Sequence, residues 1–102
     1  MKAVRAYAQN FARQTLGIPI TVEFGKQKSH ELANYGGKRM QFNVTNLGER
    51  WFDLSRNQLD IDDLITHELG HEIESNHLSK RYNDALTKIA ALAIKAVREG
   101  RL

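Results

Sequence analysis

The 102-residue sequence contains no cysteine, and this absence restricts both its cross-linking and its chemistry. Without thiols the chain forms no disulfide and offers no thiolate to a metal, so any metal ligands must be His, Asp or Glu side chains. Nothing in the sequence calls for an oxidising compartment, and we therefore expect a cytoplasmic protein.

Long apolar runs and linker-like stretches are also missing. No run of about 18 apolar residues occurs, so the sequence predicts no transmembrane helix and no membrane partner. The first five residues include the basic Lys2 and Arg5, like the start of a signal peptide, but Gln9, Asn10 and Arg13 interrupt the apolar core that a signal peptide needs. With a single proline and no Gly/Ser-rich tract, the sequence shows no linker, and we predict one domain over residues 1–102.

Neither sign of charge is strongly in excess, with 15 Lys and Arg against 12 Asp and Glu. The basic residues are scattered and form no dense stripe of the kind that nucleic-acid-binding domains present. We therefore do not expect a nucleic-acid partner, although weak attraction stays open. The content of 41% hydrophobic and 26% charged residues is typical of a globular core with a solvated surface.

Hydrophobic periodicity predicts an α+β domain. Apolar residues recur at helical spacing near both ends of the chain and around residues 61–73, whereas residues 18–24 and 33–44 show the period of two that is typical of strands. Between these regions, residues 49–57 are expected to form a loop or short helix that covers the core. The predicted order is helix 2–16, strand 18–24, a strand region 33–44 interrupted at Gly36-Gly37, helix 60–76 and helix 79–98. The two glycines form either a bulge or a turn, and a turn would make residues 33–44 a hairpin. We expect a small, mainly antiparallel sheet of two to four strands, with the last helix bracing the one before it.

The strongest motif is the segment HELGH at residues 67–71. On a helix, His67 and His71 lie one turn apart on the same face, where two imidazoles can bind one metal ion. Glu68 lies at the edge of that face and is placed to act as general base on a metal-bound water. Asp60 is the expected N-cap of this helix, and Gly70 between the histidines suggests that backbone or substrate approaches closely.

A catalytic zinc site needs three protein ligands and one open position. We predict His77, six residues after His71, as the third ligand, because the chain is expected to turn back after the helix. Glu74 and Asp84 stay open as alternatives, and Asp84 could instead orient a ligating imidazole. Glu72 is expected to point away from the metal and to be solvated.

A peptidase of this kind also needs a donor for the oxyanion that forms on the attacked carbonyl. Tyr82, Tyr35 and His30 are candidates by residue type alone. For Tyr82, packing is the favoured interpretation.

The HELGH segment, followed by His77 and then Leu78-Ser79-Lys80-Arg81-Tyr82, resembles the WLM and SprT-type metallopeptidases, which are minimal zincins. This resemblance implies a minimal zincin-like fold, with His67, His71 and His77 as zinc ligands and Glu68 as the base. Residues 33–93 are also similar to the C-terminal regions of phage and bacterial rIIA-like ATP-binding proteins. That similarity implies a segment of a longer protein that carries an ATPase domain; no ATP-site motif occurs in this chain.

The sequence therefore predicts a zinc-dependent metallopeptidase. Its expected substrate is a peptide or an unstructured protein segment, held as an added strand along an exposed sheet edge. The alternative is a non-catalytic, zinc-stabilised binding or regulatory domain, and a third hypothesis is an interaction module without metal.

Overall fold

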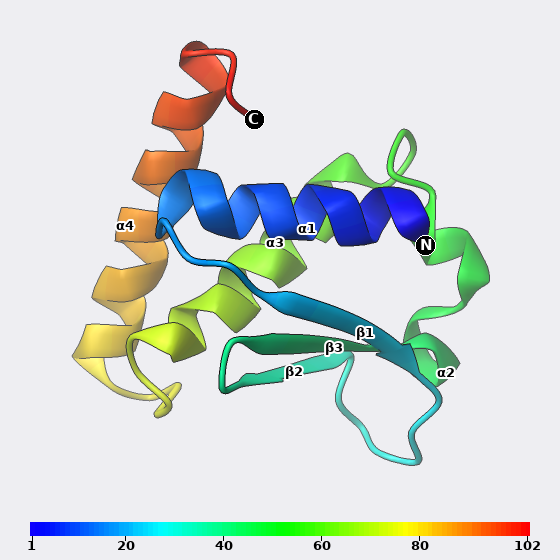
Figure 1. Ribbon diagram of the computed structural model, residues 1–102. Helices are drawn as coiled ribbons and strands as arrows, with labels where there is room; N and C mark the ends of the chain where they lie inside the picture. Colours follow the sequence, from blue (N-terminus) through cyan, green and yellow to red (C-terminus); the bar gives the residue numbers. More distant parts are fainter.

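The computed structural model describes all residues, 1–102, and confirms the α+β class. Four α-helices, two short 3₁₀ helices and three strands follow one another along the chain (Figure 1). The elements are α1 (Lys2–Thr15), β1 (Thr21–Gly25), β2 (Ala33–Gly36), β3 (Arg39–Asn43), α2 (Val44–Leu47), η1 (Glu49–Phe52), α3 (Gln58–Leu69), η2 (Gly70–Glu72) and α4 (Lys80–Arg98).

The sheet has three strands in the order β1-β3-β2, and it is mixed. The hairpin β2–β3 is antiparallel, as expected, but β1 pairs with β3 in parallel. The expectation of mainly antiparallel pairing is therefore wrong for one of the two strand pairs. Alternating apolar residues define which face of a strand is buried but not its direction, so the sequence pattern could not distinguish the two arrangements. Because β3 lies in the middle, β2 is an edge strand with one side unpaired.

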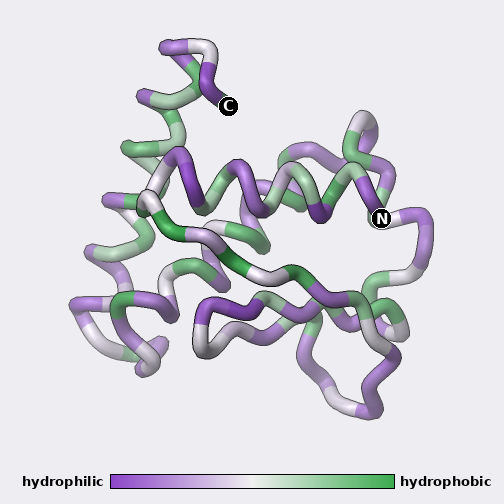
Figure 2. The backbone as a smooth tube through the Cα atoms, in the orientation of Figure 1, coloured by the Kyte–Doolittle hydropathy of each residue, from purple (hydrophilic) through white to green (hydrophobic).

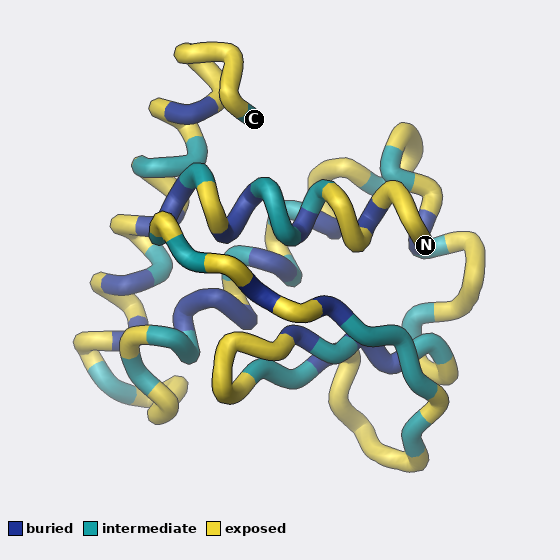
Figure 3. The backbone as a smooth tube through the Cα atoms, in the orientation of Figure 1, coloured by how far each residue is buried: buried dark blue, intermediate teal, exposed yellow.

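The core lies between the helices and one face of the sheet (Figures 2 and 3). Helix α1 packs on β1, and both α1 and α3 contact α4. The period-two pattern buries Met40 and Phe42 completely on β3, while α1 contributes Val4 and Phe11 from its apolar face. These contacts fix the position of α3, the helix that carries the histidine motif.

Helix α3 begins at Gln58, and its N-cap is Asn57 rather than Asp60. The amide of Asn57 donates hydrogen bonds to the carbonyl oxygens of Arg50 and Trp51, both at 3.0 Å. These bonds fold the preceding loop back onto η1, so the chain enters the helix one turn earlier than expected. Asp60 lies within the first turn instead, where a carboxylate still interacts favourably with the helix dipole.

The same helix ends at Leu69, well before the expected residues 75–76, and continues only as the 3₁₀ helix η2. Gly70 marks this change because α4 packs directly against it. A Cβ at Gly70 would lie 2.7 Å from Cε1 of Tyr82 and 2.8 Å from Cδ2 of Leu86. The close neighbours of Gly70 are therefore side chains of α4, not backbone or substrate, and Ile73 beyond it is 39% exposed rather than buried.

Helix α4 is capped by Ser79, whose hydroxyl accepts a hydrogen bond from the backbone N–H of Tyr82 at 3.1 Å. Tyr82, Ala85, Ile89 and Ala96 are its buried residues, so it does brace α3 and α1. None of the helices combines the length and the apolar character that crossing a bilayer would require.

Candidate metal centre

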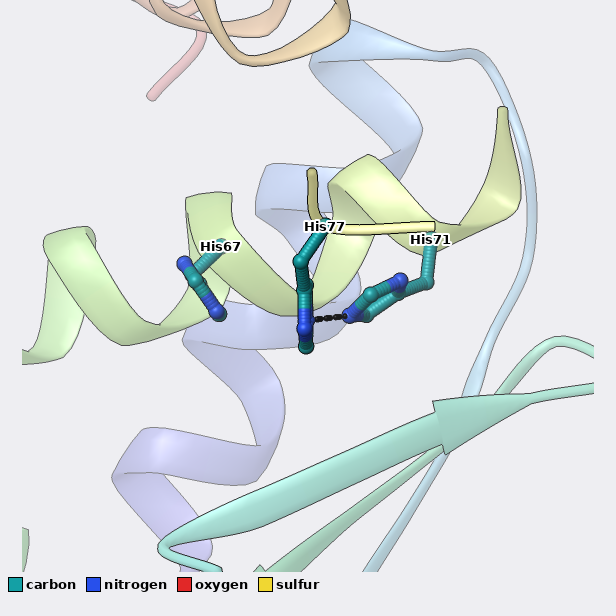
Figure 4. Close-up of side chains that lie close together, drawn as sticks. All are labelled: His67, His71 and His77. Atoms are coloured by element: carbon teal, nitrogen blue, oxygen red, sulfur yellow. Dashed lines mark hydrogen bonds between the residues drawn. The ribbon is translucent and has the colours of Figure 1, made fainter. Parts of the chain in front are cut away.

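Three histidines converge at the C-terminal end of α3 (Figure 4). His67 lies in the last turn of α3, His71 in η2, and His77 in the segment before α4. One ring nitrogen from each lies within 4.8 Å of the others. Since three imidazole nitrogens at such distances can surround one ion, the cluster could hold a metal.

His77 reaches the cluster because the chain turns back through Asn76. The side-chain oxygen of Asn76 accepts a hydrogen bond from the backbone N–H of Leu78 at 3.0 Å. The backbone carbonyl oxygen of Asn76 accepts one from the backbone N–H of Ser79 at 3.1 Å. The two Nε2 atoms of His77 and His71 are then 2.5 Å apart, as the dashed line in Figure 4 marks. At this distance the two Nε2 atoms cannot both carry a hydrogen.

The alternative ligands do not join this cluster. Asp84 pairs with Lys80 at 2.8 Å on the exposed side of α4, and the carboxylate of Glu74 faces Arg81 at 3.8 Å. Glu74 contributes through its backbone instead, because its carbonyl oxygen lies 3.2 Å from Nδ1 of His71. With Nδ1 donating there, Nε2 of His71 keeps its lone pair, which is the usual way in which a ligating histidine is oriented.

The buried ring of Tyr82 contacts all three imidazoles. Its ring stacks on His71 with centroids 5.0 Å apart and meets His67 and His77 edge-on at 5.5 and 5.1 Å. Its hydroxyl donates a hydrogen bond to the carbonyl oxygen of His67 at 2.7 Å. The packing interpretation of Tyr82 therefore agrees with the structure, and its proton is committed to the backbone.

Burial lowers the pKa of both His67 and His71, and the neighbouring imidazoles add to this effect. A lowered pKa keeps the ring neutral at physiological pH, and only the neutral ring has a lone pair for a metal. The environment of the cluster therefore favours the ligand form of these histidines.

Glu68 lies next to the histidines and is only 5% exposed. Its carboxyl makes no hydrogen bond within the protein. Every fully buried side-chain oxygen of the protein has a hydrogen-bond partner, so the carboxyl oxygens of Glu68 are not fully buried and reach the open space of the adjoining cleft. Burial, and the charge of Glu31 nearby, raise the pKa of Glu68 to about 7. An unbonded carboxyl beside three imidazoles is placed to exchange a proton with a molecule in the cleft.

The cleft has a volume of about 560 Å³ and lies between the motif helix and the sheet edge. One wall carries His67, His71, His77 and Glu68, and the other consists of β2 and the preceding residues Glu31 and Leu32. Tyr35 joins the two walls by donating a hydrogen bond to Glu72 at 2.6 Å, and Lys38 approaches the same carboxylate at 3.5 Å. The expectation that Glu72 is solvated is therefore wrong.

Among the candidate oxyanion donors, both tyrosine hydroxyls have protein acceptors: Tyr35 donates to Glu72 and Tyr82 to His67. His30 is exposed in the loop between β1 and β2 and does not line the cleft. Neither tyrosine can serve the cleft without leaving its present acceptor.

Asn43, which the sequence analysis did not single out, shapes the wall opposite the histidines. It is buried at the end of β3, and its amide donates hydrogen bonds to the carbonyl oxygens of Gln27 and Glu31 at 3.3 and 3.0 Å. Asn46 donates to Glu31 as well, at 2.8 Å. A signal was present, because two asparagines three residues apart at a strand end are typical of side chains that bond local backbone.

These features define the chain as an α+β domain with a three-histidine cluster suited to a metal ion, set beside an edge strand. In comparisons with protein families, with curated proteins and with solved structures, nothing matches this chain.

Proposed function

We propose that this domain is a zinc-dependent peptidase of the minimal zincin type. The observation that carries the proposal is the convergence of His67, His71 and His77, with their nitrogens within 4.8 Å, beside the unbonded carboxyl of Glu68 in one cleft. A reducing compartment such as the cytoplasm is part of the proposal, in keeping with a sequence that lacks cysteine.

Zinc fits the donor set better than harder cations do. The three donors are imidazoles, which suit zinc and other transition metals, whereas Mg²⁺ and Ca²⁺ prefer oxygen ligands. When bound, zinc supplies a Lewis acid that acidifies water and polarises a carbonyl group. Three protein ligands leave a position open for substrate or water, as in other catalytic zinc sites.

The residues of the chain would then share the remaining work. Glu68 takes a proton from the attacking water and passes it to the leaving nitrogen of the cleaved amide. Tyr82 holds the three imidazoles in position through its ring contacts and through its hydrogen bond to the carbonyl oxygen of His67. The bond between Tyr35 and Glu72 holds the edge strand at a fixed distance from the histidines.

A peptide is the proposed substrate class because β2 presents an unpaired strand edge along the cleft. Residues 33–36 of β2 line the cleft, and their partner β3 occupies only the opposite side. An extended segment of an unstructured protein can add to such an edge through backbone hydrogen bonds. A folded substrate has no free backbone to offer there.

The test begins with the metal content of protein purified without added zinc and with the cleavage of an unfolded protein such as reduced, alkylated lysozyme. His77→Ala should lower zinc affinity strongly, whereas His30→Ala, which removes an exposed histidine outside the cluster, should not. Glu68→Gln should keep zinc and abolish cleavage.

Three results would contradict the proposal at different points. Zinc stoichiometry near zero would reject a metal site altogether. Unchanged cleavage in Glu68→Gln would reject Glu68 as the base. Bound zinc without cleavage by the wild-type protein would favour the alternative, a zinc-stabilised binding or regulatory domain.

A further inference from the structure

A second hollow, of about 350 Å³, adjoins the cleft along α3. Leu32 and Leu64 line both spaces, so the two lie side by side along α3, and together they are called the groove. Leu32 is 47% exposed, so its side chain is accessible from both spaces. The groove therefore extends beyond the histidines, toward the N-terminal part of α3.

The walls of the second hollow suit an aliphatic chain. Leu32, Leu47 and Leu64 contribute apolar surface, and Trp51 lies partly buried beside them. Trp51 also packs on Phe42 and Phe52, with ring centroids 5.8 and 5.0 Å away, so its position is fixed. A rigid indole at the side of an apolar slot can hold methylene groups and can also attract a cation.

Two carboxylates, Asp60 and Asp63, complete the second hollow. They lie three residues apart on α3, which places them on neighbouring positions of one helix face. Neither forms an ion pair or accepts a side-chain hydrogen bond within the protein. Both residues are exposed and line the second hollow, and no Lys or Arg of this chain forms a salt bridge with either.

The distribution of charge over the molecule makes this arrangement specific. Basic residues outnumber acidic ones by 15 to 12, yet no Lys or Arg lines the cleft or the second hollow. Elsewhere the acids are mostly paired, since Glu23, Asp53, Glu72, Glu74, Asp84 and Glu99 all form salt bridges. The groove holds four acids outside these pairs, namely Glu31, Asp60, Asp63 and Glu68.

We propose that the second hollow binds the side chain of a lysine or arginine in the polypeptide segment that lies in the cleft. The aliphatic stem packs against the leucines and Trp51, and the cationic head reaches Asp60 and Asp63. This inference deepens the proposed function and rests on it, because it names basic unstructured segments as the substrate class. An apolar slot with an aromatic side and an anionic end matches the two halves of such a side chain.

Trp51 supplies the measurement, because it is the only tryptophan of the chain. The probes are flexible ten-residue peptides of Gly, Ser and Ala with one central Lys, Arg, norleucine or Glu. They are titrated against zinc-loaded Glu68→Gln protein, in which binding is separated from turnover, and Trp51 emission is followed. The Lys and Arg peptides should bind on the order of 10-fold tighter than the norleucine peptide, and the Glu peptide weakest. Raising the salt concentration should reduce this preference.

Asp60→Asn and Asp63→Asn, in the same background, locate the site. Each should reduce the preference for Lys over norleucine by at least about threefold, because one of two carboxylates is lost. Asp84→Asn removes the same charge from the exposed side of α4 and should leave the preference unchanged. Asp60 is the decisive position, because Asp63 lies one turn from His67 and its substitution could also affect that zinc ligand. The zinc content is therefore measured for every variant.

Each outcome supports or overturns the inference. Equal binding of the Lys and norleucine peptides, or no binding by any peptide, would overturn it. A Lys preference that survives both substitutions would place the cation elsewhere and would also overturn it. If wild-type protein cleaves peptides without favouring basic ones, the inference fails and the peptidase stands. If the Asp-dependent preference appears without cleavage, the binding site stands and the peptidase fails.

Discussion

The hydroxyl of Tyr82 donates a hydrogen bond to the backbone carbonyl oxygen of His67 across 2.7 Å, and so ties α4 to the last turn of α3. Carbonyl groups in the last turn of a helix have no partner within that helix. Tyr82 satisfies one of them while its ring contacts all three histidines. One buried side chain thus links the bracing helix to both the backbone and the imidazoles of the candidate metal centre.

Tyr82→Phe should weaken both the fold and the metal site. The ring stays, but the bond to His67 is lost, which should lower the free energy of unfolding by about 1 kcal/mol. Zinc affinity should fall by about 3- to 10-fold, because a group that positions a ligand is removed. The measurements are chemical denaturation and competition for zinc with a chromogenic chelator.

Tyr7→Phe is the matched control for this change. It also removes one tyrosine hydrogen bond, the one donated to Asp62 at 2.5 Å, but at a site remote from the histidines. It should lower stability without changing zinc affinity. Equal loss of zinc affinity in both variants would mean that Tyr82 acts only through general stability.

Gly70→Ala should destabilise the protein, although alanine is normally the better residue in a helix by about 1 kcal/mol. Gly70 has ordinary helical angles, so space and not backbone conformation requires glycine here. An added methyl group would meet Tyr82 and Leu86 at 2.7 and 2.8 Å and should cost about 1–3 kcal/mol in stability. Gly36→Ala, where nothing lies within 4 Å, should stay within about 0.5 kcal/mol of wild type in thermal unfolding.

The end of α3 shows where sequence reasoning stopped. The apolar residues at helical spacing, up to Ile73, indicated a helix through residues 75–76, but the α-helix ends at Leu69. What intervenes is the packing of Tyr82 and Leu86 against Gly70, a contact between residues 12 and 16 positions apart. Periodicity within one segment carries no information about such a contact.

Other parts of the site were readable because they are local. The spacing of His67 and His71 predicted that their imidazoles lie near each other, and they do, although His71 falls in η2 beyond the end of α3. The helix predicted over residues 79–98 begins at Lys80, directly after its N-cap Ser79. The cleft wall was not readable in this way, since it depends on β3 lying between β1 and β2 and on Asn43 bonding backbone 12 and 16 residues earlier. Strand order and long-range side-chain bonds arise only when the whole chain is packed.

Asn43→Asp should loosen the loop between β1 and β2. A carboxylate keeps the shape of the side chain but cannot donate to the carbonyl oxygens of Gln27 and Glu31. Glu31 keeps its bond from Asn46, but Gln27 loses its side-chain donor, and a buried charge then lies beside both carbonyl groups. We expect a loss of about 2–3 kcal/mol at pH 8 and faster amide hydrogen exchange over residues 26–32. Asn83→Asp, at an exposed position of α4, should change neither.

Glu68→Gln should change the pH dependence of stability in protein kept free of metal by EDTA. Burial raises the pKa of Glu68 to about 7 in the folded state, against 4.5 for an ordinary glutamate. Between these values the folded protein holds a proton that the unfolded chain has released. The stability of the wild-type protein therefore falls as the pH rises from about 4.5 to 7 and then levels off, as far as this group is concerned.

Glutamine does not ionise, so the difference in free energy of unfolding between Glu68→Gln and the wild type isolates the contribution of the Glu68 carboxyl. The rest of the chain is identical in the two proteins. We expect nearly equal stability at pH 5, and a variant that is more stable by about 1–3 kcal/mol at pH 8, as measured by urea denaturation. A difference that stays constant with pH would show that the carboxyl is not desolvated in the fold. If Glu68→Gln is more stable than the wild type at pH 8, the carboxyl of Glu68 lowers the stability of the wild-type protein. Such a cost is expected of a group held for chemistry rather than for packing.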